Sequence, residues 1–354
     1  RADIQFAIDY FTMRSEKYEV ISELVQSKRT FVLTGYILAK KADALKAELE
    51  KRFDLAVELA DCDPAVDPPI MLQNNPFSAP VEGVLESFGL PGRGEVDPCT
   101  VMSVFYYVLF GLMLSDAAYG LLMVIGCGFA LLKFKNMESG MRKTLQMFFY
   151  CGISTTFWGF MFGSFFGDLV GVVATTFFGR PDIALGPIWF EPVKEPMRML
   201  VFSMLMGIIH LFAGLAMKAY QYAKQKAWLD ILYDVGFWYM LLAGLVVFAL
   251  SNQMFVGILQ LSFILPVLAG TIGIAVAGIG AVGILLTAGR ESRSPFKRLL
   301  KGAYGLYGVT GYLSDILSYS RLLALGLATG VIATVVNSMG SMLGGGIVGA
   351  IVFI

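Results

Sequence analysis

The sequence has few charged residues and a single histidine. Of its 354 residues, 15% are Asp, Glu, Lys or Arg, whereas soluble globular domains have about 25%. Hydrophobic residues make up 56%, and the mean hydropathy is +0.69. So little polar surface excludes a soluble enzyme of this size. Most of the chain is therefore expected to lie in a lipid bilayer.

Cysteine and histidine are also too sparse for a disulfide framework or a metal site. The four cysteines form no CxxC pair and have no histidine at ligand spacing. No basic cluster with interleaved aromatic residues is present, so nucleic-acid binding is not expected. We accordingly predict no metal and no cofactor.

The charges are distributed unevenly along the chain. Residues 1–100 contain 11 basic and 17 acidic residues, whereas residues 101–354 contain 16 and 10. Seven of the 13 prolines lie in residues 61–98. We predict a small α+β segment at 1–60, an extended proline-rich linker at 61–100 and a membrane domain at 101–354.

Four elements are predicted in the first segment, namely an amphipathic helix over 2–27, a β-rich run at 31–37, a charged helix at 40–52 and a strand at 53–59. None of them has residues at catalytic spacing. The chain begins inside a predicted helix and stops inside an apolar run, so we expect it to be a piece of a longer protein.

The membrane domain contains several runs of about 20 or more apolar residues, the length that crosses a bilayer as a helix. They are 101–132, 144–166, 197–217, 231–250, 263–288, 302–340 and an incomplete run from Gly344. The first run is either one overlong helix or a hairpin that turns near Ser115 and Asp116. The fold class expected is mainly α, a polytopic helical membrane domain of about seven or eight transmembrane helices with the last truncated. Glycines such as Gly270, Gly273, Gly278, Gly280 and Gly283 are expected to allow close helix packing.

The charges of the loops predict the orientation. Loops 133–143, 218–228 and 290–301 contain twelve Lys and Arg residues, whereas the alternate loops 167–198 and 251–262 contain three. Cytoplasmic loops are the richer in Lys and Arg, so the first three loops are expected in the cytoplasm. We expect the hairpin at 101–132, because it places the N-terminal segment in the cytoplasm as well.

The longest apolar run, 302–340, carries Arg321 near its middle. As a helix it would extend about 58 Å, against a hydrocarbon core of about 30 Å, so it must tilt, protrude or break. An arginine at the midplane costs about 2.5–3.5 kcal/mol on insertion scales. Arg321 is therefore expected either to pair with an acid on a neighbouring helix or to line a wet path. An arginine side chain does not give up its proton in proteins, so Arg321 is expected to act as a fixed charge and not as a proton relay.

Ser314 and Ser318 share the helical face of Arg321, together with small residues such as Ala324 and Ala328. Asp315 lies six residues from Arg321, about 240° around the helix, so no pair within the helix is expected. In the predicted orientation Asp315 lies on the cytoplasmic side of Arg321 and could line a water-filled half-channel there.

Four further ionisable residues lie in or near the apolar runs. Three of them have two possible roles each, and the fourth has a structural role only. His210 either hydrogen-bonds between helices or takes part in an ion relay. Asp168 either caps a turn or helix or belongs to the ion path. Asp234 is either a solvated charge at a helix end or faces a cavity. Asp116, with Tyr119, fits a hairpin turn.

Residues 313–328, with the pattern LSDILSYSRLLALGLA, resemble the arginine-bearing helix of subunit a, also called subunit I, of rotary V/A-type ATPases of prokaryotic type. Further stretches that are similar to this family are 31–37, 75–80 with 89–91, 110–120 and 162–168. The resemblance covers nearly the whole chain. It implies that Arg321 takes the place of the family's essential arginine.

The resemblance implies a static stator subunit beside a rotating ring of proteolipid c subunits. Two offset half-channels would bring H⁺ or Na⁺ to the ring and remove it, and Arg321 would interact with the ring carboxylates. The implied partners are the c ring, the peripheral stalk subunits, the central stalk or rotor-associated subunits and the lipid bilayer. The implied location is the cell membrane, with a cytoplasmic N-terminal domain. The family's last span carries a second arginine, which would lie beyond Ile354.

In this family ATP hydrolysis and synthesis belong to other subunits, and the chain has no GxxxxGK[ST] phosphate loop. A competing interpretation is a secondary transporter with a midplane site of Asp315, His210 and Arg321. Such proteins usually contain an internal repeat, and no second copy of the Ser-Asp…Arg pattern is found. A purely structural anchor would leave the arginine unexplained.

Overall fold

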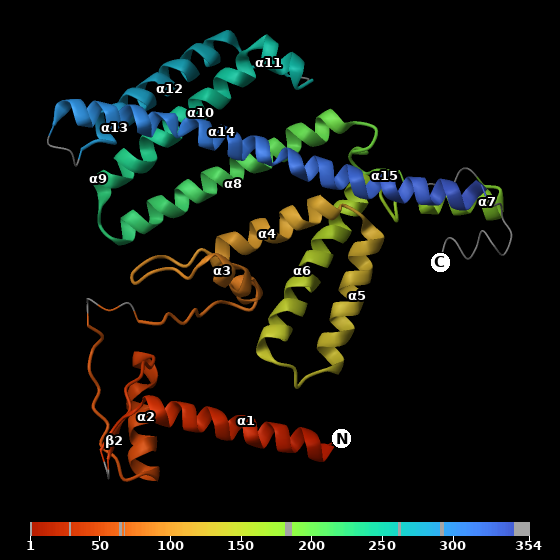
Figure 1. The fold of residues 1–354 in the computed structure, drawn as a ribbon. Coiled ribbons are helices and arrows are strands. Elements are labelled where there is room, and N and C mark those ends of the chain that lie inside the picture. Colours follow the sequence, from red (N-terminus) through yellow and green to blue (C-terminus); the bar gives the residue numbers. More distant parts are fainter. Residues whose placement is uncertain are drawn as a thin grey trace. The chain divides into compact units, whose positions relative to one another are not determined.

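In the computed structural model the chain is mostly helical and divides into two compact units, Arg1–Met71 and Leu72–Ile354 (Figure 1). The structure describes residues 2–27, 30–63, 66, 68–180, 186–260, 263–290 and 294–342. The incomplete span predicted from Gly344 lies outside the described residues.

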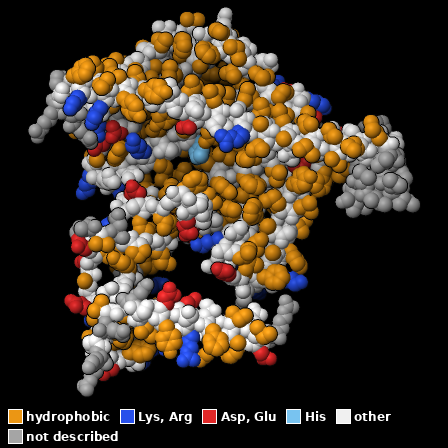
Figure 2. Space-filling model, in the orientation of Figure 1, with side chains coloured by type: hydrophobic (Ala, Val, Ile, Leu, Met, Phe, Trp, Pro, Cys, Tyr) orange, Lys and Arg blue, Asp and Glu red, His pale blue; other side chains and the backbone are white. Residues whose placement is uncertain are grey.

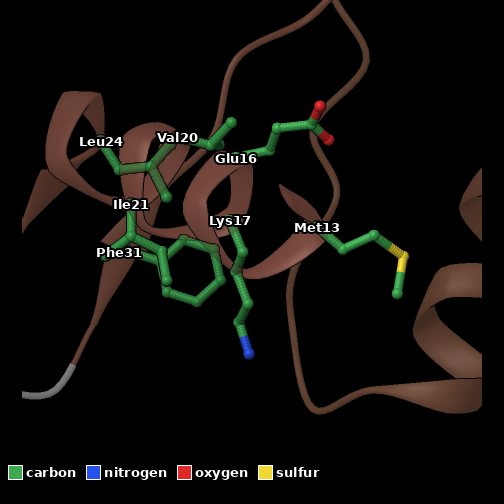
Figure 3. A pocket seen from close by; sticks show the side chains of 7 residues that line it. All are labelled: Met13, Glu16, Lys17, Val20, Ile21, Leu24 and Phe31. Carbon is green, nitrogen blue, oxygen red and sulfur yellow. The ribbon is translucent and has the colours of Figure 1, made fainter. Parts of the chain in front are cut away.

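The first unit contains two helices and a minimal β-hairpin. Its elements are α1 (Ala2–Glu23), β1 (Val25–Gln26), β2 (Phe31–Val32) and α2 (Ala39–Arg52). The strands are antiparallel, with Val25 opposite Val32. One shallow groove lies between α1 and β2 (Figure 3), lined by Met13, Glu16, Lys17, Val20, Ile21, Leu24 and Phe31.

Two predictions for this unit need correction. The strand predicted at 53–59 does not form, because no other strand among the described residues pairs with it and an isolated strand has no ladder of hydrogen bonds. The helix predicted over 2–27 forms, but it ends at Glu23. Its described side chains from Asp3 to Ser22 are all exposed, so α1 buries no apolar face against the described residues of its own unit.

The second unit is built of helices. In chain order they are η1 (Ala79–Val81), α3 (Glu82–Phe88), α4 (Cys99–Leu114), α5 (Ala117–Lys133), α6 (Ser139–Phe162), α7 (Leu169–Phe178), α8 (Pro196–Lys224), α9 (Trp228–Ile231), the π-helical η2 (Leu232–Gly236), α10 (Phe237–Ser251), α11 (Gln253–Ile258), α12 (Val267–Thr287), α13 (Pro295–Tyr307), α14 (Val309–Ser318) and α15 (Ser320–Met342).

Four described stretches are long and apolar enough to cross a membrane, namely Pro196–Lys224, Trp228–Ser251, Val267–Thr287 and Phe296–Met342. Helices α4, α5 and α7 are apolar but shorter. Hydrophobic side chains cover much of the visible face of the helices (Figure 2). A helical membrane protein, as predicted, accounts for so much exposed apolar surface.

The run 101–132 is split, as the hairpin interpretation requires. Ser115 ends α4 in the left-handed region, with φ of 41°. The carboxylate of Asp116 then caps α5 by accepting hydrogen bonds from the backbone N–H groups of Ala118 and Tyr119. Helices α4 and α5 each pack against α6. The reversal is therefore fixed by one strained residue and one N-cap.

The prediction of an extended linker is wrong for residues 79–88, which are helical. Val81 is fully buried and packs with Tyr107 of α4. Glu82 is also buried, and its carboxylate accepts hydrogen bonds from Lys143 of α6 at 2.6 Å and from Asn74 at 2.9 Å. Buried apolar contacts and a half-buried ion pair thus fix this segment on the helical unit, which proline content alone could not reveal.

Among the described helices, α10 and α12 share the most extensive contact. Gly273 and Gly280 of α12 are buried against the backbone of α10, and Gly244 of α10 lies against Gly273 and Ala277. The predicted role of small residues is confirmed for these positions. Gly278 differs, because nothing lies within 4 Å of where its Cβ would be.

The predicted overlong run is one nearly continuous helix. Helices α13, α14 and α15 follow one another over Phe296–Met342, 47 residues, and they are drawn in blue in Figure 1. At 1.5 Å per residue this is about 70 Å, more than twice the hydrocarbon thickness. The helical ladder is interrupted only briefly, at Gly308 and at Tyr319.

Candidate functional site

Arg321 lies in the first turn of α15, two residues after the interruption at Tyr319. Its Nη2 donates a hydrogen bond of 2.7 Å to the hydroxyl of Ser318. The side chain is exposed, and no carboxylate of the described residues lies within ion-pair distance of it. The acid on a neighbouring helix that one interpretation required is thus not found in the described part of the chain.

The face of the long helix around Arg321 is uncovered. The residues that share it are all exposed, and four of the six are small, namely Ser314, Ser318, Ala324 and Ala328, beside the larger Leu317 and Leu325. Short side chains let another backbone approach closely. A guanidinium on such a face is available to a carboxylate supplied from outside this chain.

Asp315 is exposed one turn and a half before Arg321. Its carboxylate makes no hydrogen bond or ion pair with any residue that the structure describes, and it is not joined to Arg321. This agrees with the angular separation of the two residues on the helix.

His210 is joined to the arginine-bearing helix through Tyr319. Its Nδ1 makes a short hydrogen bond with the Tyr319 hydroxyl. The ring of Phe105 from α4 stacks on the imidazole, with 4.3 Å between ring centroids. Gly207, one turn earlier in α8, lies directly against the Tyr319 ring. Three helices therefore meet at this histidine.

Asp116 is the most heavily hydrogen-bonded carboxylate among the described residues. It is 1% exposed. Besides the two amides of α5, it accepts hydrogen bonds from the Ser164 hydroxyl at 2.7 Å and from the backbone N–H groups of Phe166 at 3.1 Å and Gly167 at 2.9 Å. Five donors satisfy one buried charge, so the α4–α5 turn and the 163–168 loop form one rigid junction.

Asn337 of α15 extends this junction to the arginine-bearing helix. Its side-chain amide is buried and donates to the carbonyl oxygen of Phe166 and to the carboxylate of Asp168, each at 2.8 Å. Asp168 directly precedes α7 but makes no side-chain cap to it. A cavity of about 60 Å³ adjoins this place, with Ser115, Asp168, Glu191 and Thr334 among its lining residues. It has room for water molecules with several polar partners.

Asp234 belongs to a separate charged cluster at the start of the α10 stretch. Arg290 binds its carboxylate with two hydrogen bonds of 3.0 and 3.1 Å and also contacts Asp230 at 2.8 Å. The Tyr222 hydroxyl donates to Asp234 at 3.2 Å. The hydrogen bonds to Asp234 raise the pKa of Arg290 above its usual value, so the guanidinium keeps its charge.

Two hydrogen bonds therefore involve the predicted site residues. One joins Ser318 to Arg321, and the other joins His210 to Tyr319, the residue that follows Ser318. No hydrogen bond or ion pair between described residues links Asp315, His210 and Arg321 into the midplane site of the transporter interpretation. No group of three or more His, Cys, Asp or Glu side chains in the described ranges is placed to hold a metal. The sequence reasoning missed Asn337, Tyr319 and Arg290. The signal for Asn337 was an amide side chain inside an apolar run.

Comparisons with known proteins find that this chain is similar to subunits of V-type and A-type ATPases. The model of the V-type ATPase 116kDa subunit family matches residues 8–180. The A-type ATP synthase subunit I of Methanocaldococcus jannaschii is 30% identical over 95% of this chain and 50% of the relative. That of Thermococcus kodakarensis is 25% identical over 99% of this chain and 52% of the relative. The V-type ATP synthase subunit I of Chlamydia trachomatis is 23% identical over 91% and 55%. The chain spans about half the length of these relatives.

Proposed function

We infer the function of this chain from the family to which it belongs, the V-type ATPase 116kDa subunit family, and propose that it is the membrane part of the stator subunit of a rotary ATPase. In this role it is not catalytic, because ATP is hydrolysed or made on other subunits. It forms a multi-pass domain of the cell membrane, and its basic loops and N-terminal unit lie in the cytoplasm.

The observation that carries the proposal is the setting of Arg321. A guanidinium in the middle of a long apolar helix requires a counter-charge or water. No acid of the described residues supplies the counter-charge, and the surrounding face is exposed and built mainly of small side chains. A carboxylate carried by a ring of c subunits fits this gap in both charge and shape.

The electrostatics then explain ion transfer. A fixed positive charge stabilises the ionised form of a carboxylate that comes near it, so the carboxylate releases its bound H⁺ or Na⁺. The same charge repels cations that would otherwise leak straight past the stator. Arg321 therefore makes each ring carboxylate empty on one side and fill on the other, which couples ion flow to rotation.

The two half-channels approach Arg321 from opposite sides of the membrane. The small polar cavity beside Asp168 supports an access path on the side away from the basic loops. Asp315, with Ser314 and Ser318 on the neighbouring face, supports a path on the cytoplasmic side. Asp234, whose carboxylate Arg290 binds, is a further member of the ion path in this proposal. His210, which is bonded to Tyr319, lies beside the arginine-bearing helix and is not needed to carry the ion.

Partners follow from the same proposal. The uncovered face of the long helix contacts the c ring, the N-terminal unit connects to the peripheral stalk subunits, and the central stalk turns with the ring. Lipid covers the remaining apolar helices.

The test is ATP-driven ion uptake by vesicles that contain the intact complex, measured with a fluorescent pH probe for H⁺ and with radioactive Na⁺. We compare the wild type with Arg321→Ala and Arg321→Lys, and with Lys301→Ala as a control that removes an exposed cation from the same long helix. We expect Arg321→Ala to abolish uptake in an assembled complex, and Lys301→Ala to leave it unchanged. Normal uptake by an assembled Arg321→Ala complex would exclude the proposal.

A further inference from the structure

Tyr319 occupies the point at which the long helix is interrupted. It ends α14, and α15 begins at the next residue. The backbone stays near helical geometry there, with φ of −68° and ψ of −12°. Residues two apart on a helix project about 200° from each other. A side chain fixed at Tyr319 therefore determines where Arg321 points.

The Tyr319 ring is held on one side by α8. A Cβ on Gly207 would come within 2.6 Å of the ring, so only glycine leaves room for it. One turn later, His210 bonds the Tyr319 hydroxyl. Phe105 of α4 stacks on the imidazole and limits its rotation. The ring is thus fixed by shape at one edge and by a hydrogen bond at its tip.

We propose that Gly207 and His210 are positioning residues that act through Tyr319 to hold Arg321 on the uncovered face of the long helix. The inference rests on the proposed function, in which Arg321 meets the ring carboxylates. Because Tyr319 points toward α8, Arg321 is turned away from α8 and toward the exposed face. His210 then contributes through its hydrogen bond and not by carrying the ion.

The bonding of His210 supports this division of roles. A neutral imidazole has one donor nitrogen and one acceptor nitrogen. Its Nδ1 is used by the Tyr319 hydroxyl, and one face of the ring is covered by Phe105. A histidine that relays protons needs both nitrogens accessible in turn, whereas one that holds a tyrosine needs only this one.

The test separates positioning from ion transfer by means of Gly207, which has no side chain that could carry an ion. Gly207→Ala puts a methyl group against the Tyr319 ring. Gly214→Ala is the matched control on the same helix, because nothing lies within 4 Å of its Cβ position. Both are measured in intact complexes in vesicles, as ion uptake per ATP hydrolysed, after assembly has been checked.

We expect His210→Phe and Tyr319→Phe each to lower uptake per ATP about fivefold, the ratio that corresponds to one hydrogen bond of about 1 kcal/mol. Gly207→Ala should also lower it, because the added methyl group displaces the Tyr319 ring from its place beside His210. The double variant His210→Phe/Tyr319→Phe should be no worse than either single one, because both remove the same contact. The pH profile of the remaining uptake should match that of the wild type, and Gly214→Ala should behave as wild type.

A shifted pH profile in His210→Phe, together with normal uptake in Gly207→Ala, would overturn the inference and make His210 part of the ion path. If Gly207→Ala does not assemble, ion uptake by Tyr319→Phe tests the inference instead, because this variant keeps the ring and loses only the hydroxyl. Normal uptake in Tyr319→Phe would equally overturn it. The proposed function is judged separately by Arg321→Ala, so the two failures are distinguishable.

Discussion

The side-chain amide of Asn337 in α15 donates a hydrogen bond of 2.8 Å to the carboxylate of Asp168, which directly precedes α7. The same amide donates to the carbonyl oxygen of Phe166. One buried side chain thereby ties the far end of the arginine-bearing helix to the 163–168 loop.

Removing this tie should destabilise the helical unit. Asn337→Leu has a similar volume but removes two hydrogen bonds, to the half-buried Phe166 carbonyl and to the exposed Asp168 carboxylate. Because water can replace part of this contact, we expect a loss of about 0.5–1.5 kcal/mol. We expect a lower Tm for the purified complex in thermal unfolding. Ser338→Ala, at the exposed neighbouring position, is the control and should keep the wild-type Tm. Equal Tm values for both variants would show that the hydrogen bonds of Asn337 do not stabilise the helical unit.

Asp116→Asn should be more damaging than its small change in shape suggests. The new amide group turns N–H donors toward a site where five donors already converge. We expect a loss of at least about 1–3 kcal/mol, seen as a lower Tm and faster proteolysis of the 163–168 loop.

The matched control for that variant is Asp315→Asn, since this exposed carboxylate makes no hydrogen bond within the described residues. It should leave both the Tm and the proteolysis rate unchanged. A junction that tolerated Asp116→Asn as well as this control would mean that its hydrogen bonds contribute little.

The pair Glu82–Lys143 should act as a unit in a double-mutant cycle. Glu82 is 5% exposed, but the Lys143 side chain is 43% exposed, so water screens part of the attraction. From Glu82→Gln, Lys143→Met and the double variant we expect a coupling energy of about 1 kcal/mol in thermal unfolding, weaker at high salt. Strict additivity of the two substitutions would show that the contact adds no stability.

Two glycines two residues apart in α12 should respond in opposite ways. Gly280→Ala places a methyl group 2.7 Å from the backbone of α10, and overpacking of this kind costs about 1–3 kcal/mol. Gly278→Ala meets nothing within 4 Å and should be neutral, or stabilising by up to about 1 kcal/mol through helix propensity. Thermal unfolding of both variants decides, and similar Tm values would mean that α10 and α12 can separate at little cost.

Local patterns predicted the parts of the fold that depend on local physics. The break at Ser115 and Asp116 and the overlong run that carries Arg321 both follow from the apolar pattern of the sequence. The strand at 53–59 was predicted from alternation alone, and alternation does not supply a partner strand. The helix at 79–88 was missed because prolines suggest a linker, whereas burial of Val81 and Glu82 depends on α4 and α6.

The candidate site was harder to predict, because its contacts join residues far apart in the sequence. His210 and Tyr319 are 109 residues apart, and Asn337 and Asp168 are 169 apart. The sequence identified Arg321 because a charge in an apolar run is conspicuous by itself. It could not identify Gly207 as the residue that admits the Tyr319 ring, since a glycine in an apolar helix has packing as its ordinary role.

The exposed small side chains beside Arg321 have a mechanical consequence. Helices lock in place when ridges of side chains on one enter the grooves of the other. Ser314, Ala324 and Ala328 raise only low ridges beside the exposed Leu317 and Leu325, so a helix that lies against this face finds no continuous row of ridges to fix its register. If the proposed function holds, successive helices of the ring would slide past this surface with little friction, and each would meet the same charge as it passes.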